Sequence, residues 1–219
     1  MIKGFIFDLD GVITDTAEQH FEAWKKLADE LGWIFDRKVN EKLRGVSRMA
    51  SINIIKDHNK ANVDEDTLFH LAEKKNNYYK EALKELSQDD FLPGAKELLI
   101  HLKREGFKVA LGSSSKNAKT VLSQLQATPY FDAVADGNST KRSKPEPDIF
   151  LFGAKALKLK PEECIVFEDA ESGVDAAKKG GFHSVGIGPK GRVGHADVRF
   201  ETMKEATLFA VKSSFKNLF

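Results

Sequence analysis

Short apolar runs alternate with helical patterns through most of the chain. Runs with the composition of β-strands occupy residues 5–9, 108–112, 133–136, 165–168 and 184–187. Each is followed by a loop and then by a segment in which apolar residues have helical spacing. This alternation is typical of a parallel sheet whose strands are joined by crossover helices, so we predict an α/β fold.

The segment between the first two expected strands breaks this alternation. From about residue 16 to residue 86 no strand is predicted, and apolar side chains recur every three or four positions, as at Ala17, Phe21, Trp24, Ala28 and Leu31. We interpret the segment as a helical lobe inserted into the α/β domain. The expected division is a catalytic core of residues 1–15 and 88–219 and a helical cap domain of residues 16–87.

A lysine interrupts the second helical stripe of the expected cap. Lys75 stands where the spacing of Leu68, Leu71 and Ala72 calls for an apolar residue. Two interpretations remain open. The side chain buries its methylene groups and extends its ammonium group to water, or it points at an anionic ligand beneath the lobe.

Composition excludes some classes of protein but does not indicate a particular function. The 219 residues are 41% hydrophobic, and 34 basic residues balance 33 acidic ones, so we expect no nucleic-acid partner. The only cysteine is Cys164, which excludes an internal disulfide. No apolar run is long enough to span a bilayer and the first residues do not resemble a signal peptide, so we expect no membrane partner and a cytoplasmic location.

Polar residues gather at the carboxyl ends of the expected strands, where open parallel sheets place their ligand sites. Asp8 lies near the end of the first strand and Asp10 follows it, and residues 113–117 (SSSKN) follow the second. Lys144 follows the third strand, whereas Glu168 and Asp169 end the fourth. A cluster at one strand end is often only a turn or a helix cap. Four clusters at corresponding ends predict one shared site.

The residue types at this site suit magnesium-dependent phosphoryl transfer. The carboxylates of Asp8, Asp10 and Asp169 are hard oxygen ligands of the kind that Mg²⁺ prefers. Ser113 and the amides of its loop suit phosphate oxygens, and Lys144 suits charge neutralisation. We expect Asp8 to attack the phosphorus and Asp10 to act as general acid and base. Turn and cap roles remain alternatives for the individual acidic and serine residues.

Taken together, these motifs resemble the haloacid dehalogenase superfamily. The resemblance lies in DLDGV at residues 8–12, the serine-ended second strand, KPEPD at residues 144–148 and the acidic pair at residues 168–169. It covers essentially the whole chain and implies a Rossmann-like core with an inserted helical cap. It also implies that Asp8 becomes phosphorylated and that Mg²⁺ is bound by Asp8, the backbone carbonyl of Asp10 and Asp169, with Glu168 assisting.

Segments of the cap and of the core narrow the resemblance to the β-phosphoglucomutase family. They are FDLDGVITDTAEQHFEAW, LRGVSRMAS, AEKKNNYY and GSSSKNA. This resemblance implies catalytic roles for Thr16 and His20 near the hinge, besides Asp8, Asp10, Ser113 and Lys144. The substrate-binding residues that it implies are Gly45, Val46, Ser47, Arg48, Ser51, Lys75, Ser114, Ser115, Lys116 and Asn117.

The expected function is therefore that of an isomerase of carbohydrate metabolism. It would interconvert β-D-glucose 1-phosphate and glucose 6-phosphate through a phosphoaspartate and β-glucose 1,6-bisphosphate, in a monomer with a small sugar phosphate as its partner. The first alternative is a sugar-phosphate phosphatase of the same superfamily. The second is a sensor that binds a sugar phosphate without turnover. No function is assigned to the basic pair Lys141 and Arg142.

Overall fold

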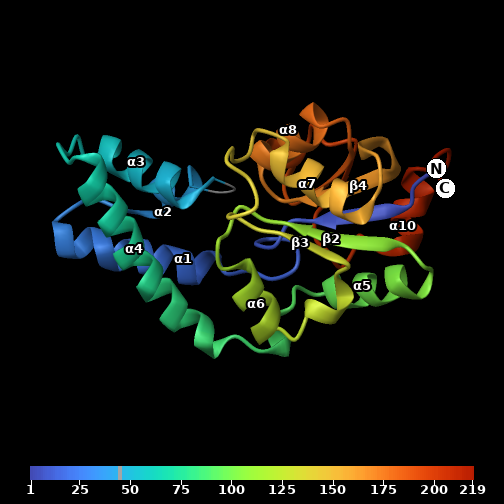
Figure 1. Ribbon diagram of the computed structural model, residues 1–219, viewed down its shortest axis with the longest axis horizontal. Coiled ribbons are helices and arrows are strands. Elements are labelled where there is room, and N and C mark those ends of the chain that lie inside the picture. Colours follow the sequence, from blue (N-terminus) through green and yellow to red (C-terminus); the bar gives the residue numbers. More distant parts are fainter. Residues whose placement is uncertain (44–45) are drawn as a thin grey trace.

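A parallel β-sheet forms the centre of the computed structural model, which describes residues 1–43 and 46–219. Within those residues the sheet has six strands in the order β3-β2-β1-β4-β5-β6, and all of its pairs are parallel. The strands are β1 (Gly4–Phe7), β2 (Lys108–Gly112), β3 (Ala133–Ala135), β4 (Cys164–Glu168), β5 (His183–Ile187) and β6 (Val198–Phe200). The predicted α/β fold is confirmed (Figure 1).

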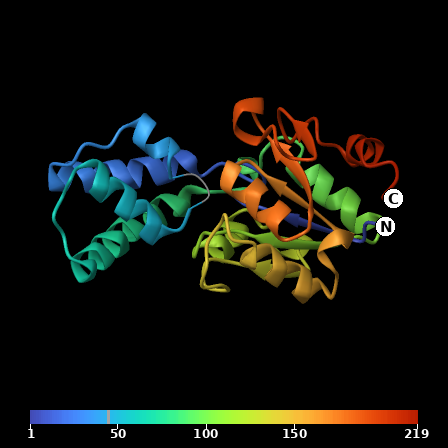
Figure 2. The same ribbon diagram turned by 90° about the horizontal axis from the view of Figure 1, so that it is seen from above.

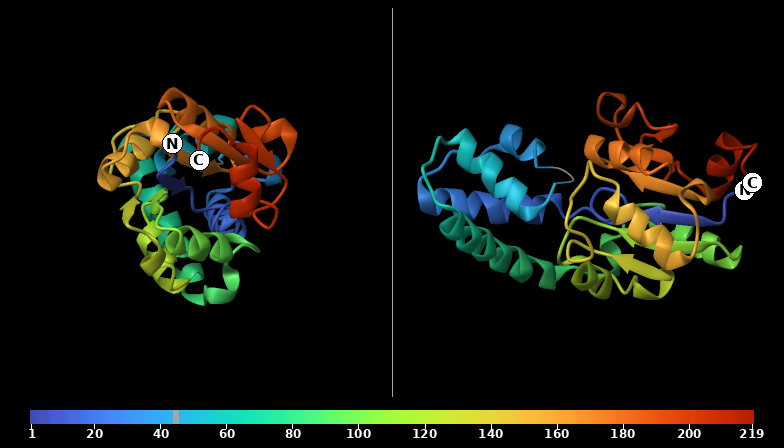
Figure 3. Two further views of the ribbon diagram at one scale, coloured as in Figure 1. Left: turned by 90° about the vertical axis from the view of Figure 1, so that its right-hand side faces the viewer. Right: turned by 45° about the horizontal axis from the view of Figure 1, so that its top comes forward.

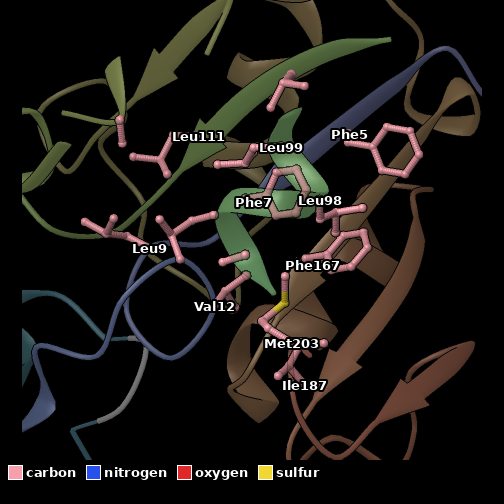
Figure 4. Close-up of a cluster of buried hydrophobic side chains, with 14 of the residues drawn as sticks. Phe5, Phe7, Leu9, Val12, Leu98, Leu99, Leu111, Phe167, Ile187 and Met203 are labelled. Carbon is pink, nitrogen blue, oxygen red and sulfur yellow. The ribbon is translucent and has the colours of Figure 1, made fainter. Parts of the chain in front are cut away.

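Helices cover both faces of the sheet. Successive side chains of a strand point to opposite faces, and the apolar side chains of β1 are buried on both. Phe5 and Phe7 of β1 pack with α5 (Ala95–Arg104), α6 (Ala118–Gln124) and α10 (Leu208–Ser214). Ile6 packs on the other side with α7 (Asp148–Leu157) and α8 (Glu171–Lys179). Figure 4 shows Phe7 surrounded by Leu98, Leu99 and Phe167. The rings of Phe7 and Phe167 stack with centroids 4.8 Å apart.

A group of four helices stands apart from the sheet among the described residues. We call α1 (Ala17–Leu31), α2 (Arg37–Glu41), α3 (Arg48–His58) and α4 (Glu65–Ala82) the helical cap. Its helices enclose their own buried cluster, which includes Trp24, Leu27, Ile52, Ile55 and Leu68. The cap lies at one end of the molecule and both chain termini lie at the other (Figures 1, 2 and 3).

Side-chain caps fix the starts of three cap helices. Asp36, Ser47 and Asp64 each accept a hydrogen bond from the backbone amide three residues later. Such a cap typically stabilises a helix by about 1 kcal/mol, since it satisfies an amide that has no partner within the helix. Ser47 is therefore tied to the first turn of α3.

The strands differ from the predictions at one edge of the sheet and at its centre. The edge strand β6 was not predicted, because its three residues are half-buried and too few to show an alternating pattern. The strand β1 ends at Phe7 rather than at residue 9, since the carbonyl of Leu9 accepts amides of the turn that follows. The remaining short helices are α9 (Lys190–Val193) and the 3₁₀ turns Leu83–Glu85, Gln88–Asp90, Thr128–Tyr130 and Pro161–Glu163.

None of the helices in the described part of the chain is long and apolar enough to cross a bilayer.

Candidate active site

Asp8 lies at the end of β1, where the sheet meets the cap. Its amide donates to the carbonyl of Phe167 at 2.9 Å, which extends the pairing with β4 by one residue. The chain then turns at Gly11, whose φ is +81°. A Cβ atom at Gly11 would lie 2.4 Å from Cγ of Asp169, so glycine lets the ends of β1 and β4 approach closely.

A buried lysine joins two of the predicted acidic residues. Nζ of Lys144 lies 2.5 Å from Oδ1 of Asp8 and 2.6 Å from Oε1 of Glu168. Burial raises the pKa of Asp8 well above its usual range; Lys144 acts against this and Glu168 adds to it. Burial alone would lower the pKa of Lys144, but the two carboxylates outweigh it and raise that pKa above its usual value. Lys144 therefore carries a positive charge beside the predicted nucleophile.

The same strand ends form a potential metal site. Oxygens of Asp8, Glu168 and Asp169 all lie within 4.8 Å of one another. These carboxylates suit a hard divalent cation. Glu168 is already engaged, because its Oε2 accepts the amide of Ala170 at 2.7 Å while its Oε1 accepts Lys144. Asp8 and Asp169 are thus the better candidates for direct ligands, and Glu168 is better placed to hold Lys144.

The loop after β2 links the core to the cap. Oγ of Ser113 accepts the amide of Ser115 at 3.1 Å, and Oγ of Ser115 accepts the amide of Asn117 at 3.2 Å. Nδ2 of Asn117 donates to Oδ1 of Asn76 in α4 at 2.7 Å, and both side chains are buried. The predicted anion-binding loop is therefore fastened directly to a cap helix.

Asp10 is connected to the cap through hydroxyl groups. Thr16 donates its hydroxyl to Oδ1 of Asp10, and the hydroxyls of Thr16 and Tyr79 are 2.9 Å apart. Burial raises the pKa of Asp10, although the hydrogen bond from Thr16 lowers it. Burial, followed by the charge of Asp10, also raises the pKa of Tyr79 well above its usual range. The tyrosine is therefore neutral and able to donate.

Two buried basic side chains meet beside this chain of hydroxyls. Nζ of Lys75 lies 2.7 Å from Nδ1 of His20, whose ring stacks on that of Tyr79 with centroids 3.8 Å apart. Burial, followed by the charges of Lys75 and Arg48, holds the pKa of His20 well below its usual range. Burial and Arg48 likewise hold the pKa of Lys75 well below its usual range. A neutral imidazole can accept the hydrogen bond from Lys75.

Arg48, one of the predicted substrate-binding residues of the cap, forms an ion pair with a carboxylate of α4. Nη1 of Arg48 contacts Oε1 of Glu73 in α4. The side chain of Arg48 is 15% exposed and that of Glu73 is 42% exposed. Nearby Ser51 is buried in the first turns of α3. A ligand phosphate would therefore have to displace or share the carboxylate of Glu73 to reach the guanidinium group.

One cavity of about 390 Å³ collects most of the predicted site residues. Thr16, Lys144 and Glu168 do not line it: Thr16 contacts Asp10, Lys144 contacts Asp8, and Glu168 contacts Lys144. Gly45 lies outside the described residues. The unassigned Lys141 and Arg142 also border the cavity. The predicted residues that line it are Asp8, Asp10, His20, Val46, Ser47, Arg48, Ser51, Lys75, Ser113, Ser114, Ser115, Lys116, Asn117 and Asp169.

The position of the Lys75 side chain decides against one of the two interpretations given for it above. Its side chain is 2% exposed and faces the cavity, so the interpretation that its ammonium group reaches bulk water is wrong. The ammonium nitrogen instead lies 4.7 Å from the ring centroid of Trp24, which also lines the cavity. Such a contact partly replaces the lost hydration of the cation.

Three residues of α4 were not identified from the sequence. Asn76, Tyr79 and Glu73 contact Asn117, Thr16 and Arg48, respectively. Tyr79 follows Lys75 by four positions and so shares its helix face, a signal that could have identified it. Its neighbour Tyr78 lies outside the site: it is half-buried and donates to Glu30.

Known proteins resemble this chain over nearly its whole length. A family model described as haloacid dehalogenase-like hydrolase matches residues 2–181. The β-phosphoglucomutase of Bacillus subtilis is 40% identical over 212 residues, which cover 94% of this chain and 92% of that protein. A phosphorylated carbohydrates phosphatase of Thermotoga maritima is 31% identical and covers 84% of each chain.

A solved structure agrees with this assignment. The crystal structure of a β-phosphoglucomutase from Clostridium difficile superposes with a TM-score of 0.95 at 41% identity, over 99% of this chain and 98% of that one. The resemblance inferred from the motifs is thereby confirmed. The chain belongs to the haloacid dehalogenase-like hydrolase family.

Proposed function

We propose that the chain is a magnesium-dependent β-phosphoglucomutase, which interconverts β-D-glucose 1-phosphate and glucose 6-phosphate through β-glucose 1,6-bisphosphate. The observation that carries the proposal is the shared cavity. Asp8 borders it from the core, and Arg48 and Lys75 border it from the cap. One cavity thus offers a nucleophile to one phosphate of a bisphosphate and cations to the other.

Phosphoryl transfer to Asp8 first requires positive charge that offsets the repulsion between its carboxylate and the phosphate. A carboxylate about 4 Å from a phosphate charge is repelled by about 4 kcal/mol at an effective dielectric constant near 20. Lys144, with two carboxylate partners at 2.5 and 2.6 Å, keeps a positive charge beside Asp8. Asp8 and Asp169 would hold Mg²⁺ with the carbonyl of Asp10, and the bound ion would supply further charge neutralisation at the phosphate oxygens.

Positioning of the phosphate falls to the loop after β2. Ser113 is buried at the carboxyl end of that strand and lines the cavity with Ser114. Its hydroxyl and the loop amides would bind equatorial phosphate oxygens while Asp8 attacks the phosphorus in line. The leaving oxygen needs a proton, and we assign this transfer to Asp10, which borders the same cavity two residues after the nucleophile.

The cap would select the substrate and exclude water. Arg48 suits the phosphate that does not react, because its planar guanidinium group can bind two oxygens at once. Lys75, Ser51 and His20 would surround the sugar and that distal phosphate. We propose residues 16–87 as a cap domain that closes over residues 1–15 and 88–219. Closure would protect the phosphoaspartate from hydrolysis.

A sugar-phosphate phosphatase is the second candidate, since the relative from Thermotoga maritima carries the name of a phosphatase. The two functions share the core residues and differ in what attacks the phosphoaspartate. The test supplies β-glucose 1-phosphate, Mg²⁺ and a trace of bisphosphate, then compares glucose 6-phosphate with free phosphate. Glucose 6-phosphate as the main product supports the mutase. Free phosphate as the main product would favour the phosphatase, and binding without either product would favour a sensor.

A monomeric state and a cytoplasmic location stay predictions. Sedimentation of the purified chain at several concentrations would test the monomer directly.

A further inference from the structure

Arg192 contacts Asp169, one of the two carboxylates best placed to bind metal. Its Nε donates to the backbone carbonyl of Asp169 at 2.6 Å, and its Nη2 lies 3.6 Å from Oδ2 of the same residue. The arginine side chain is 28% exposed, whereas that of Asp169 is 8% exposed. One guanidinium group therefore touches both the backbone and the carboxylate of one residue.

Two glycines, one in β5 and one after it, allow Arg192 to approach Asp169. A Cβ atom at Gly186 would lie 2.8 Å from Cβ of Val193, so α9 packs directly on the end of the strand. Gly188 follows with a φ of +124°, and a Cβ atom there would lie 2.7 Å from Nη2 of Arg192. Glycine at position 186 leaves room for Val193 of α9, and glycine at position 188 leaves room for the guanidinium group, which reaches Asp169.

Asp169 is confined from a second direction as well. Gly11 approaches its carboxylate so closely that any β-carbon would collide with it. The carboxylate thus lies between the turn after β1 and the guanidinium group that follows β5. A ligand held by surrounding groups binds metal more tightly than one free to rotate, because less freedom is lost when the ion arrives.

We propose that Arg192 is a positioning residue for the metal site, which holds the carboxylate of Asp169 in the orientation that binds Mg²⁺. The inference rests on the proposed function, since it presumes a magnesium ion between Asp8 and Asp169. It adds the end of a fifth strand to the four strand ends that the motifs identified.

The charge of Arg192 and its contacts with Asp169 predict opposite effects of its removal on Mg²⁺ affinity. A positive group near a cation repels it, so removing the charge alone would tighten Mg²⁺ binding. Loss of the orienting contacts would weaken it, typically about 10- to 100-fold for partners of metal ligands. Arg192 is partly exposed and its nearest contact is the carbonyl, so solvent screens its charge while the hydrogen bond persists.

The test measures Mg²⁺ affinity by calorimetry on the full chain without substrate. We expect Arg192→Gln and Arg192→Lys each to weaken binding about tenfold or more, because neither side chain can contact both atoms of Asp169. The matched control is Arg199→Gln. Arg199 has the same 28% side-chain exposure and donates to the carbonyl of Gly188 at 2.8 Å, next to the same loop.

A kinetic readout separates positioning from general damage. At saturating Mg²⁺ the Arg192 variants should regain most of the wild-type kcat, while the Mg²⁺ concentration for half-maximal rate rises about tenfold. Unfolding temperatures within the range of the Arg199 control would show that the variants are folded.

Three results would overturn the positioning role of Arg192, and a fourth would refute the magnesium site itself. Tighter Mg²⁺ binding in Arg192→Gln, or wild-type affinity in Arg192→Lys, would overturn the positioning role. Equal weakening by Arg199→Gln would overturn it too, since any disturbance of the loop would then suffice. A wild-type chain that binds no Mg²⁺ would instead refute the magnesium site of the proposed function.

Discussion

Lys75 places a cationic side chain inside the cap at a cost in stability. It is 2% exposed, and its hydrogen bond goes to a neutral imidazole nitrogen of His20 at 2.7 Å rather than to a carboxylate. Replacing buried ionic groups by apolar ones is often stabilising by about 1–4 kcal/mol, whereas losing a hydrogen bond costs about 0.5–1.5 kcal/mol. We therefore expect Lys75→Met to raise the free energy of unfolding by about 1–3 kcal/mol.

The pH dependence follows from the lowered pKa of Lys75, whose usual value is 10.5. Between the folded pKa and 10.5 the unfolded chain binds more protons, so wild-type stability rises with pH in this window. The advantage of Lys75→Met should be largest near neutral pH and should shrink as the pH approaches 10.5. Thermal unfolding at several pH values measures it, at about 2–4 °C per kcal/mol for a chain of this size.

The adjacent lysine provides a matched control on the same helix. Lys74 is 53% exposed in its side chain and lies 2.7 Å from Glu30. Such surface pairs contribute about 0.2–1 kcal/mol, so Lys74→Met should unfold at or slightly below the wild-type temperature. The reasoning would be refuted if Lys75→Met were destabilised at neutral pH, or if its stability relative to wild type did not change with pH.

Further substitutions test other contacts of the site. Lys144→Met should lower the free energy of unfolding by about 3–5 kcal/mol, since it leaves two buried carboxylates without their cation; wild-type stability in thermal unfolding would contradict this. Tyr79→Phe should lower kcat up to about tenfold through loss of the hydroxyl beside Thr16, with unchanged Mg²⁺ affinity; an unchanged kcat would exclude that role. Glu73→Gln should free Arg48 and tighten calorimetric binding of glucose 6-phosphate several-fold; weaker binding would show that Glu73 assists the ligand.

Features that depend on local sequence were predicted well. The strand β2 begins and ends where the pattern placed it, because a run of five residues bounded by polar loops defines a buried strand clearly. The placement of Asp8, Ser113, Lys144 and Asp169 near one another follows from topology, since parallel strands bring their carboxyl ends to the same edge. Lys75 was noticed because it broke an apolar stripe.

Contacts between residues that are far apart in the chain could not be predicted from the sequence. The ion pair of Arg48 and Glu73 joins residues 25 positions apart on different helices, and no local pattern indicates it. Arg192 lies in the short helix α9 within a glycine-rich segment that has the composition of solvated surface, yet the close packing of α9 on β5 brings it to Asp169. Both contacts become visible only once the helices and loops have been placed around the sheet.

The central claim is that Asp8 carries the phosphoryl group. Rapid quenching of the enzyme with radiolabelled β-glucose 1,6-bisphosphate and Mg²⁺, followed by peptide mapping, tests it most directly. The account predicts label on the peptide that contains Asp8, its appearance no slower than turnover, and no label in Asp8→Asn. Turnover without label on that peptide, or a labelled and active Asp8→Asn variant, would contradict it.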